Sequence, residues 1–107
     1  MTELEKLKNY LDDNGYESKY AHHGHLDLGN NKPDQVIVYN HGVRSWDAVC
    51  HEWSYGGKDG LLEIYGTICN DVIGWLTADD VIKILNHYAK QGPNWVPINS
   101  LCDIEEG

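Results

Sequence analysis

Four side chains of the types that bind metals lie close together in the segment HHGHLD. His22, His23, His25 and Asp27 could converge on zinc or a similar ion from a loop. The set is incomplete as a metal motif, so we interpret these residues as exposed loop histidines and predict that the protein needs no cofactor. A small metal-dependent enzyme that uses this histidine-rich loop is the alternative.

A thiol next to an imidazole is a second arrangement with chemical potential. Cys50 directly precedes His51, and an imidazole can generate the reactive thiolate of a nucleophilic cysteine. The surrounding segment is predicted to be a strand, in which neighbouring side chains point to opposite faces. Cys50 would then face the core and His51 the solvent, so we interpret Cys50 as a structural cysteine.

Acid–base chemistry is a third possibility, because a carboxylate opposite an imidazole raises the basicity of the imidazole. His51, Glu63 and Asp47 would share the open face of a sheet, but neither a nucleophile nor a pocket is evident near them. Cross-strand charge pairs commonly stabilise sheets, and we prefer that interpretation. The prediction is therefore a protein that has no catalytic residues and is not an enzyme.

The helices that flank these residues are predicted from capping signals and apolar periodicity. A capping box at Thr2 and Glu5 predicts a first helix over residues 3–13, and a similar start at Thr77 predicts a second over 78–91. One face of the second helix should be buried, and its residues are predicted to be Val81, Ile82, Leu85, Tyr88 and Ala89.

Apolar alternation and turn residues predict the strands. The fold class is α+β: an antiparallel meander sheet of four or five strands, with an N-terminal helix and a helix of the C-terminal half packed on one face. Residues 1–107 should form a single domain, in which 92–107 is an extended tail that packs through Trp95 and Val96. The strands are expected at 16–20, 35–39, 43–53, from about 61, and at 72–76.

The loop at 54–60 sets an expected register between two central strands. It places Trp46 opposite Ile68 and Cys50 opposite Ile64, which gives one wholly apolar face. The other face would carry His51 opposite Glu63. Trp46 should lie in the core.

Composition limits the partners that the protein can bind. Seventeen acidic residues against eight basic ones leave a net charge of −9, which repels phosphate backbones and anionic membranes. We therefore predict no direct binding of nucleic acid and no membrane association. Three cysteines without a CxxC pair, and an N-terminus without a long apolar run, predict a cytoplasmic protein with free thiols.

The segments RSWDAVCHEWSYGGKDGLLEIYG and DVIGWLTADDVI, within residues 44–82, resemble a group of small uncharacterised acidic proteins from phages and mobile elements of Gram-positive gut bacteria. The resemblance implies a context of anti-CRISPR and other anti-defence inhibitors, and brings no catalytic residue with it. In that context an acidic surface is steered toward a cationic groove, and aromatic anchors slow dissociation.

Together these observations predict a non-enzymatic phage-type accessory protein in the cytoplasm of a host cell. It would bind and inhibit a host defence protein, most plausibly a CRISPR effector nuclease. A homodimeric structural protein, paired through Trp75 or Trp95, is a further alternative. The acidic and aromatic residues predicted to contact the partner are Asp47, Glu63, Tyr65, Asp71, Trp75, Asp79 and Asp80.

Overall fold

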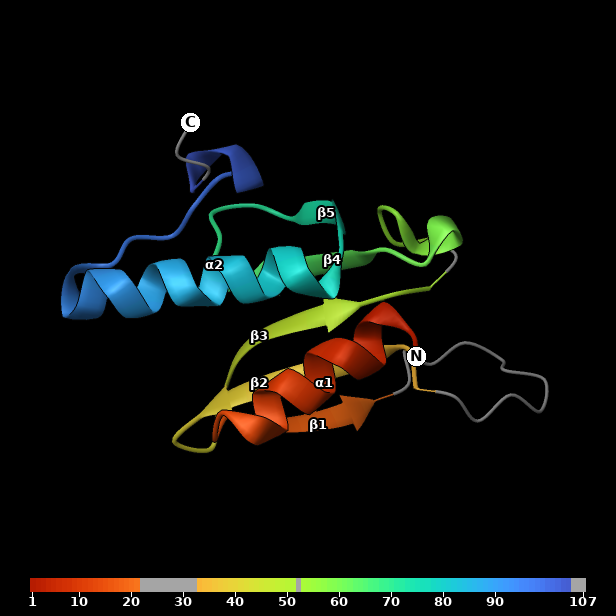
Figure 1. Cartoon of the computed structure of the whole chain (residues 1–107), viewed down its shortest axis with the longest axis horizontal. Coiled ribbons are helices and arrows are strands. Elements are labelled where there is room, and N and C mark those ends of the chain that lie inside the picture. Colours follow the sequence, from red (N-terminus) through yellow and green to blue (C-terminus); the bar gives the residue numbers. More distant parts are fainter. Residues whose placement is uncertain (22–32, 52, 105–107) are drawn as a thin grey trace.

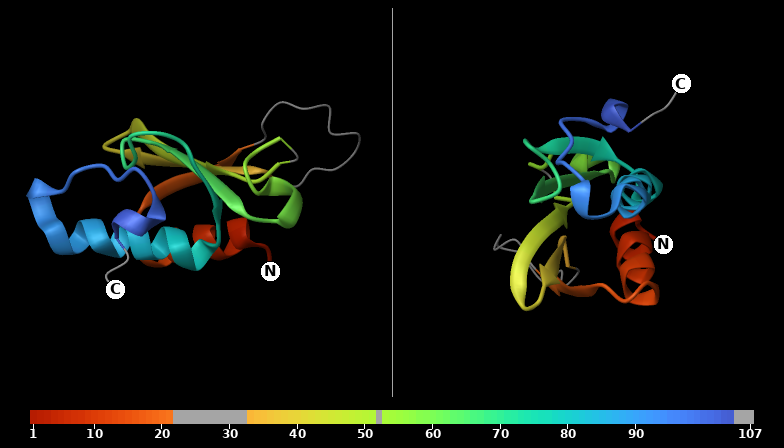
Figure 2. Two further views of the ribbon diagram at one scale, coloured as in Figure 1. Left: turned by 90° about the horizontal axis from the view of Figure 1, so that it is seen from above. Right: turned by 90° about the vertical axis from the view of Figure 1, so that its left-hand side faces the viewer.

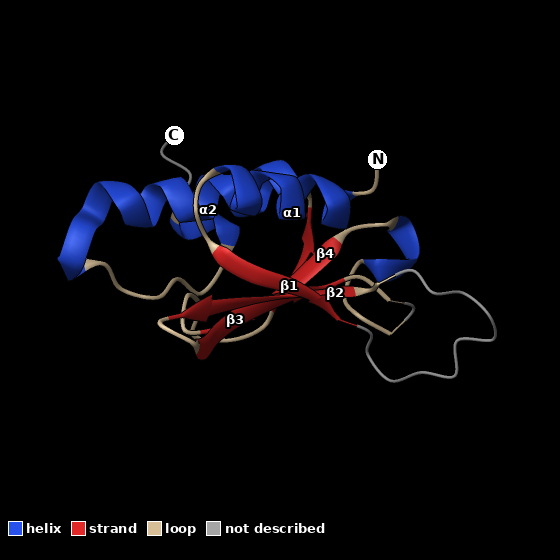
Figure 3. Ribbon diagram, turned by 90° about the horizontal axis from the view of Figure 1, so that it is seen from below, coloured by secondary structure: helices blue, strands red, loops and turns tan. Residues whose placement is uncertain are grey.

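The computed structural model of the chain describes residues 1–21, 33–51 and 53–104. It contains a five-stranded antiparallel sheet in the order β1-β2-β3-β4-β5. Two α-helices cover one face of the sheet in Figures 1 and 2, and Figure 3 shows helices and strands as two layers. The predicted α+β meander is confirmed. Its elements are α1 (Glu3–Asp13), β1 (Glu17–Ala21), β2 (Gln35–Asn40), β3 (Val43–Val49), β4 (Leu62–Gly66), β5 (Ile73–Leu76) and α2 (Ala78–Gln91).

Both helices begin at capping boxes, as predicted. In α1 the Thr2 amide donates to Glu5 Oε1 at 2.9 Å, and the Glu5 amide donates to Thr2 Oγ1 at 3.1 Å. The equivalent bonds at the start of α2 join Thr77 and Asp80, at 3.0 and 3.1 Å. Each box satisfies backbone N–H groups of the helix start that have no acceptor inside the helix.

An apolar core lies between the sheet and the helices, and Trp46 belongs to it as predicted. The buried stripe of α2 differs from the predicted one, because Ile84 is fully buried whereas Ala89 is exposed. The buried face is therefore rotated around the helix axis away from Ala89 and toward Ile84, and Ile82 lies at its margin. The other core residues of the helices and strands are Leu4, Leu7, Leu11, Val36, Val38, Ala48, Leu62, Ile64, Ile73, Leu76, Ala78, Leu85 and Tyr88.

The predicted register between β3 and β4 was wrong by two residues. Trp46 pairs with Gly66 instead of Ile68, and Val49 takes the place opposite Glu63 that was predicted for His51. Because strand side chains alternate with a period of two, this shift keeps the same residues on each face. The apolar face was therefore predicted correctly although the pairs were not.

A turn around Ser54 explains the shift, because it ends β3 at Val49 and not at the predicted Trp53. Ser54 Oγ accepts from the His51 amide at 3.0 Å and donates to the His51 carbonyl at 2.8 Å. Such bonds between a side chain and the backbone compete with a strand ladder. A Cβ on Gly57 would lie 1.8 Å from the His51 carbonyl oxygen, so the turn requires glycine at this position.

The C-terminal tail is anchored by Ile98 and Ile104, and not by Val96 as predicted. Val96 is 65% exposed, whereas Ile98 is 4% and Ile104 8% exposed. Ile98 forms a parallel bridge with Cys69, and its carbonyl accepts from the Asn70 amide at 2.9 Å. The tail thus lies alongside the segment between β4 and β5.

Tyr88 joins the tail to α2. Its buried hydroxyl donates to the Ile68 carbonyl and accepts from the Ile98 amide at 3.2 Å. Trp95 packs against the Tyr88 ring at a centroid distance of 4.8 Å, so its predicted role in holding the tail is confirmed. Two 3₁₀ turns interrupt the predicted extended course of the tail, at Gly92–Asn94 and Leu101–Asp103.

Candidate functional site

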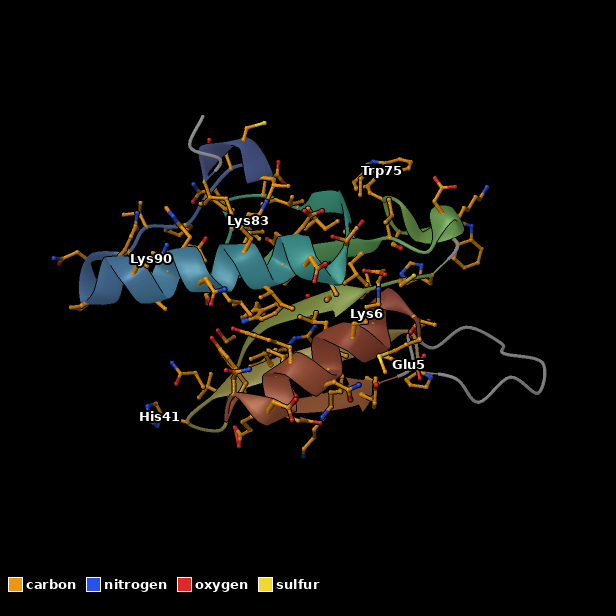
Figure 4. All side chains as sticks on the ribbon, in the orientation of Figure 1. Glu5, Lys6, His41, Trp75, Lys83 and Lys90 are labelled. Atoms are coloured by element: carbon orange, nitrogen blue, oxygen red, sulfur yellow. The ribbon has the colours of Figure 1, made fainter. Side chains whose placement is uncertain are left out.

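A β-bulge in β5 holds Trp75 in an unusual backbone conformation. The ladder with β4 skips a residue, so that Gly74 and Trp75 together lie across from Glu63. Trp75 has φ +61°, a left-handed value that is an outlier for a bulky residue. Its side chain is 61% exposed, and Figure 4 shows it projecting beyond β5 at the border of the sheet. Bulges redirect side chains, and strained residues of this kind cluster at functional sites.

Tyr55 lies directly against this bulge. The Trp75 amide donates to the Tyr55 carbonyl at 3.1 Å. A Cβ on Gly74 would lie 2.2 Å from Tyr55 Cβ, and a Cβ on Gly56 would lie 2.9 Å from Trp75 Cα. Glycine at both positions therefore allows the loop to approach β5 closely. The Tyr55 side chain is also exposed, so two large aromatic residues from separate segments lie together at the surface.

We call Tyr55, Tyr65 and Trp75 the aromatic surface. Tyr65 is exposed on the outer face of β4, the strand that pairs with β5. Glu63 lies two residues before it on the same face, and Glu63 Oε1 accepts from the Tyr55 amide at 2.9 Å. Glu63 therefore ties the loop to the sheet, and its carboxylate is already engaged within the molecule.

Asp47, which lies opposite Tyr65, is also engaged within the molecule. Its Oδ2 accepts from Gln35 Nε2 at 2.7 Å and lies 3.3 Å from Arg44 Nη2. Only 14% of its side chain is exposed. Asp47 therefore stabilises the pairing of β2 with β3 and presents little charge to a partner.

The start of α2 receives carboxylates from both helices. Glu3 Oε1 of α1 accepts from the Ala78 amide at 2.7 Å, and Asp80 occupies the capping box. The bond from Ala78 lowers the pKa of Glu3, and Lys6 lowers it further, although burial opposes both effects. Asp79 is exposed, and its side chain makes no ion pair within the described residues.

Asp71 precedes β5 and is exposed. Its Oδ1 accepts a local bond from the Val72 amide at 2.8 Å. Asp71 and Asp79 are therefore the predicted partner-binding acids that present their charge to solvent. The acids bound within the molecule are Asp47, Glu63 and Asp80.

The environment of Cys50 does not favour a reactive thiolate. Burial, and after it the charge of Asp34, raises the pKa of the half-buried Cys50 thiol. His51 Nδ1 accepts from the Trp53 amide at 3.2 Å, so this imidazole is bonded to its own loop. Cys50 and His51 both lie outside β3, so the strand geometry expected for them was wrong. Burial supports a structural cysteine instead.

The histidine-rich metal candidate falls outside the described residues, so His22, His23, His25 and Asp27 stay a prediction. Elsewhere, in residues 1–21, 33–51 and 53–104, no three His, Cys, Asp or Glu side chains gather in a way that could hold a metal ion. The described helices also include none that is long and apolar enough to cross a membrane.

Sequence reasoning missed Tyr55 and Glu3. Gly56 and Gly57 mark a loop in the sequence but do not indicate that Tyr55 packs on β5. In the sequence Glu3 is an ordinary acidic residue in the first turn of a helix, and no neighbouring residue indicates that it bonds to the second helix. No family model, curated protein or solved structure matches the chain.

Proposed function

We propose that the protein is a non-enzymatic binding module that docks on a host defence protein through the aromatic surface and inhibits it. The observation that carries this proposal is Trp75, exposed in a left-handed bulge and held there by Tyr55. A conformation of this kind costs on the order of 1–3 kcal/mol. Tryptophan and tyrosine are typical anchors of protein interfaces, so a contact with a partner is a physical reason to keep the strain.

The charge of the chain supports a cationic partner. A net charge of −9 steers the molecule toward positive surfaces and raises the rate of encounter. Asp71 and Asp79, on either side of β5 in the sequence, add solvent-facing charge. A groove that normally holds nucleic-acid phosphates has the complementary chemistry, and a CRISPR effector nuclease in the host cytoplasm is the partner class that we propose.

The first experiment is affinity capture from lysate of a bacterium that carries CRISPR systems. Bound proteins are eluted along a salt gradient and identified by mass spectrometry. We expect a nuclease that is released as the salt concentration rises, because salt screens charge attraction. The captured nuclease is then purified, and its DNA cleavage is measured against increasing amounts of the protein.

Two variants separate the aromatic surface from the rest of the molecule. Trp75→Ala should weaken inhibition by roughly thirtyfold, the effect of losing an interface anchor. Val43→Ala is the matched control, since Val43 is 69% exposed at the β2–β3 hairpin. That hairpin, marked by His41, lies at the other end of the molecule from Trp75 in Figure 4. Equal inhibition by both variants, or capture of no cationic partner, would contradict the proposal.

A further inference from the structure

β1 is the outermost strand on one side of the sheet, and Figure 1 shows no described element beyond it. Alternate residues of a strand direct their backbone groups to opposite neighbours. The Thr67 amide donates to the Ser45 carbonyl at 3.0 Å, so Ser45 faces β4, and the next residue, Trp46, faces its partner Val38 in β2. Ile37, next to Val38, therefore faces β1, and its partner Lys19 faces back toward β2.

Ser18 and Tyr20 alternate with Lys19, so their backbone N–H and C=O groups point away from the sheet. In the described part of the chain, no partner outside the β1–β2 ladder bonds to these groups. An open strand edge of this kind is a template for pairing with another chain.

We propose that a second copy of the chain pairs with this edge, with its β1 antiparallel and the two-fold axis at Ser18. In this register Ser18 lies opposite Ser18 of the other copy. Glu17 lies opposite Lys19 of the other copy, so two pairs of opposite charge form. Within a single chain Glu17 Oε1 accepts from the Gly42 amide at 3.2 Å, and Lys19 Nζ lies 5.8 Å from the centroid of the Tyr39 ring. Among the described residues neither has an ion pair, so both charges can still pair with a second copy.

Charge and aromatic pairing both select this register. A two-fold axis at Lys19 would set Lys19 opposite itself, and like charges directly opposite each other are destabilising. With the axis at Ser18, Tyr16 lies opposite Tyr20 of the second copy. These side chains are 36% and 42% exposed, and cross-strand aromatic pairs stabilise antiparallel strands.

The backbone bonds of this pairing are few. Ser18 bonds to Ser18 of the other copy in both directions, and the Tyr20 amide meets the Tyr16 carbonyl. The Tyr16 amide already donates to the Leu11 carbonyl at 3.0 Å, so it does not take part. The dimer should therefore depend on protein concentration.

The test is the mass of the full chain in solution, measured by light scattering over a range of concentrations. The mass should rise from 12.1 kDa to about twice that value. Glu17→Lys and Lys19→Glu each set like charges opposite each other, and each should weaken the dimer by roughly tenfold or more. An equimolar mixture of the two variants restores opposite charges at both pairs, so the mixture should associate. Circular dichroism checks that each variant is folded.

Three results would overturn the proposal. If the wild-type chain stays monomeric at every concentration, a second copy does not pair with β1, and an extended segment of another protein becomes the candidate partner of this edge. A dimer that survives both substitutions would lie elsewhere, for example at Trp75 or Trp95. Variants that remain separate when mixed would exclude the Glu17–Lys19 pairing. Nuclease inhibition is measured independently at the aromatic surface, so failure of either proposal leaves the other to its own test.

Discussion

The strained backbone at Trp75 can be measured by comparing two substitutions at one position. Trp75→Gly and Trp75→Ala both remove the indole ring and every contact that it makes. They differ by a single methyl group, which only the alanine variant must hold in the left-handed conformation at φ +61°. The comparison therefore isolates the backbone from the side chain.

The expected difference follows from two opposing terms. A Cβ in the left-handed region costs about 1–2 kcal/mol, which destabilises the alanine variant. The greater freedom of glycine in the unfolded chain costs about 0.5–1 kcal/mol, which destabilises the glycine variant. The free energy of unfolding should therefore be higher for Trp75→Gly, by about 0.5–1 kcal/mol. At an ordinary strand position the order would be reversed.

Urea unfolding of both variants measures this difference, provided that the two transitions have the same slope. Both variants should bind the captured nuclease equally weakly, because both lack the indole. An alanine variant at least as stable as the glycine variant would refute the left-handed conformation in solution. Backbone strain would then no longer be an argument for a binding site at Trp75.

Two further predictions concern the start of α2. Glu3→Gln should lower the free energy of unfolding at neutral pH by about 1 kcal/mol, because the charged acceptor of the Ala78 amide is lost. The pKa of Glu3 is lower in the folded protein than in the unfolded chain. Its contribution to the free energy of unfolding is therefore complete above the ordinary carboxyl pKa, and it disappears as the pH falls through the pKa of the folded state. Urea unfolding should therefore separate wild type from Glu3→Gln at neutral pH, and a gap that persists in acid would contradict this cause. Asp80→Ala should be less stable than Asp79→Ala by about 1 kcal/mol, since only Asp80 belongs to the capping box. Thermal unfolding of this charge-matched pair checks the difference, and equal stabilities would exclude a capping role for Asp80.

The helix boundaries could be predicted because their signals are local. A capping box such as Thr77 and Asp80 is complete within a few residues, and so is the apolar period that follows it. The sheet faces could be predicted for a similar reason, since alternation survives a register shift of two. The pairs could not, because the Ser54 turn that ends β3 depends on hydrogen bonds with no clear pattern in the sequence.

The candidate site was predictable only in part. Trp75 and Tyr65 were singled out as surface aromatics, and both are exposed. The sequence could not show which acidic side chains are free to contact a partner, because their hydrogen bonds involve residues that are distant along the chain. Asp47 is bonded to Gln35, twelve residues away. Tyr55 reaches the site through a bulge opposite Glu63 that the sequence does not indicate.

The two borders of the sheet differ in a way that affects aggregation. At β5, the Trp75 amide is already bonded to the Tyr55 carbonyl, so the loop covers that border at Trp75. Among the described strands, β1 is thus left as the open border. Fibrils grow when each added molecule presents a fresh edge to the next one. A molecule with one open edge offers no such continuation: when two copies meet at β1, growth ends with them.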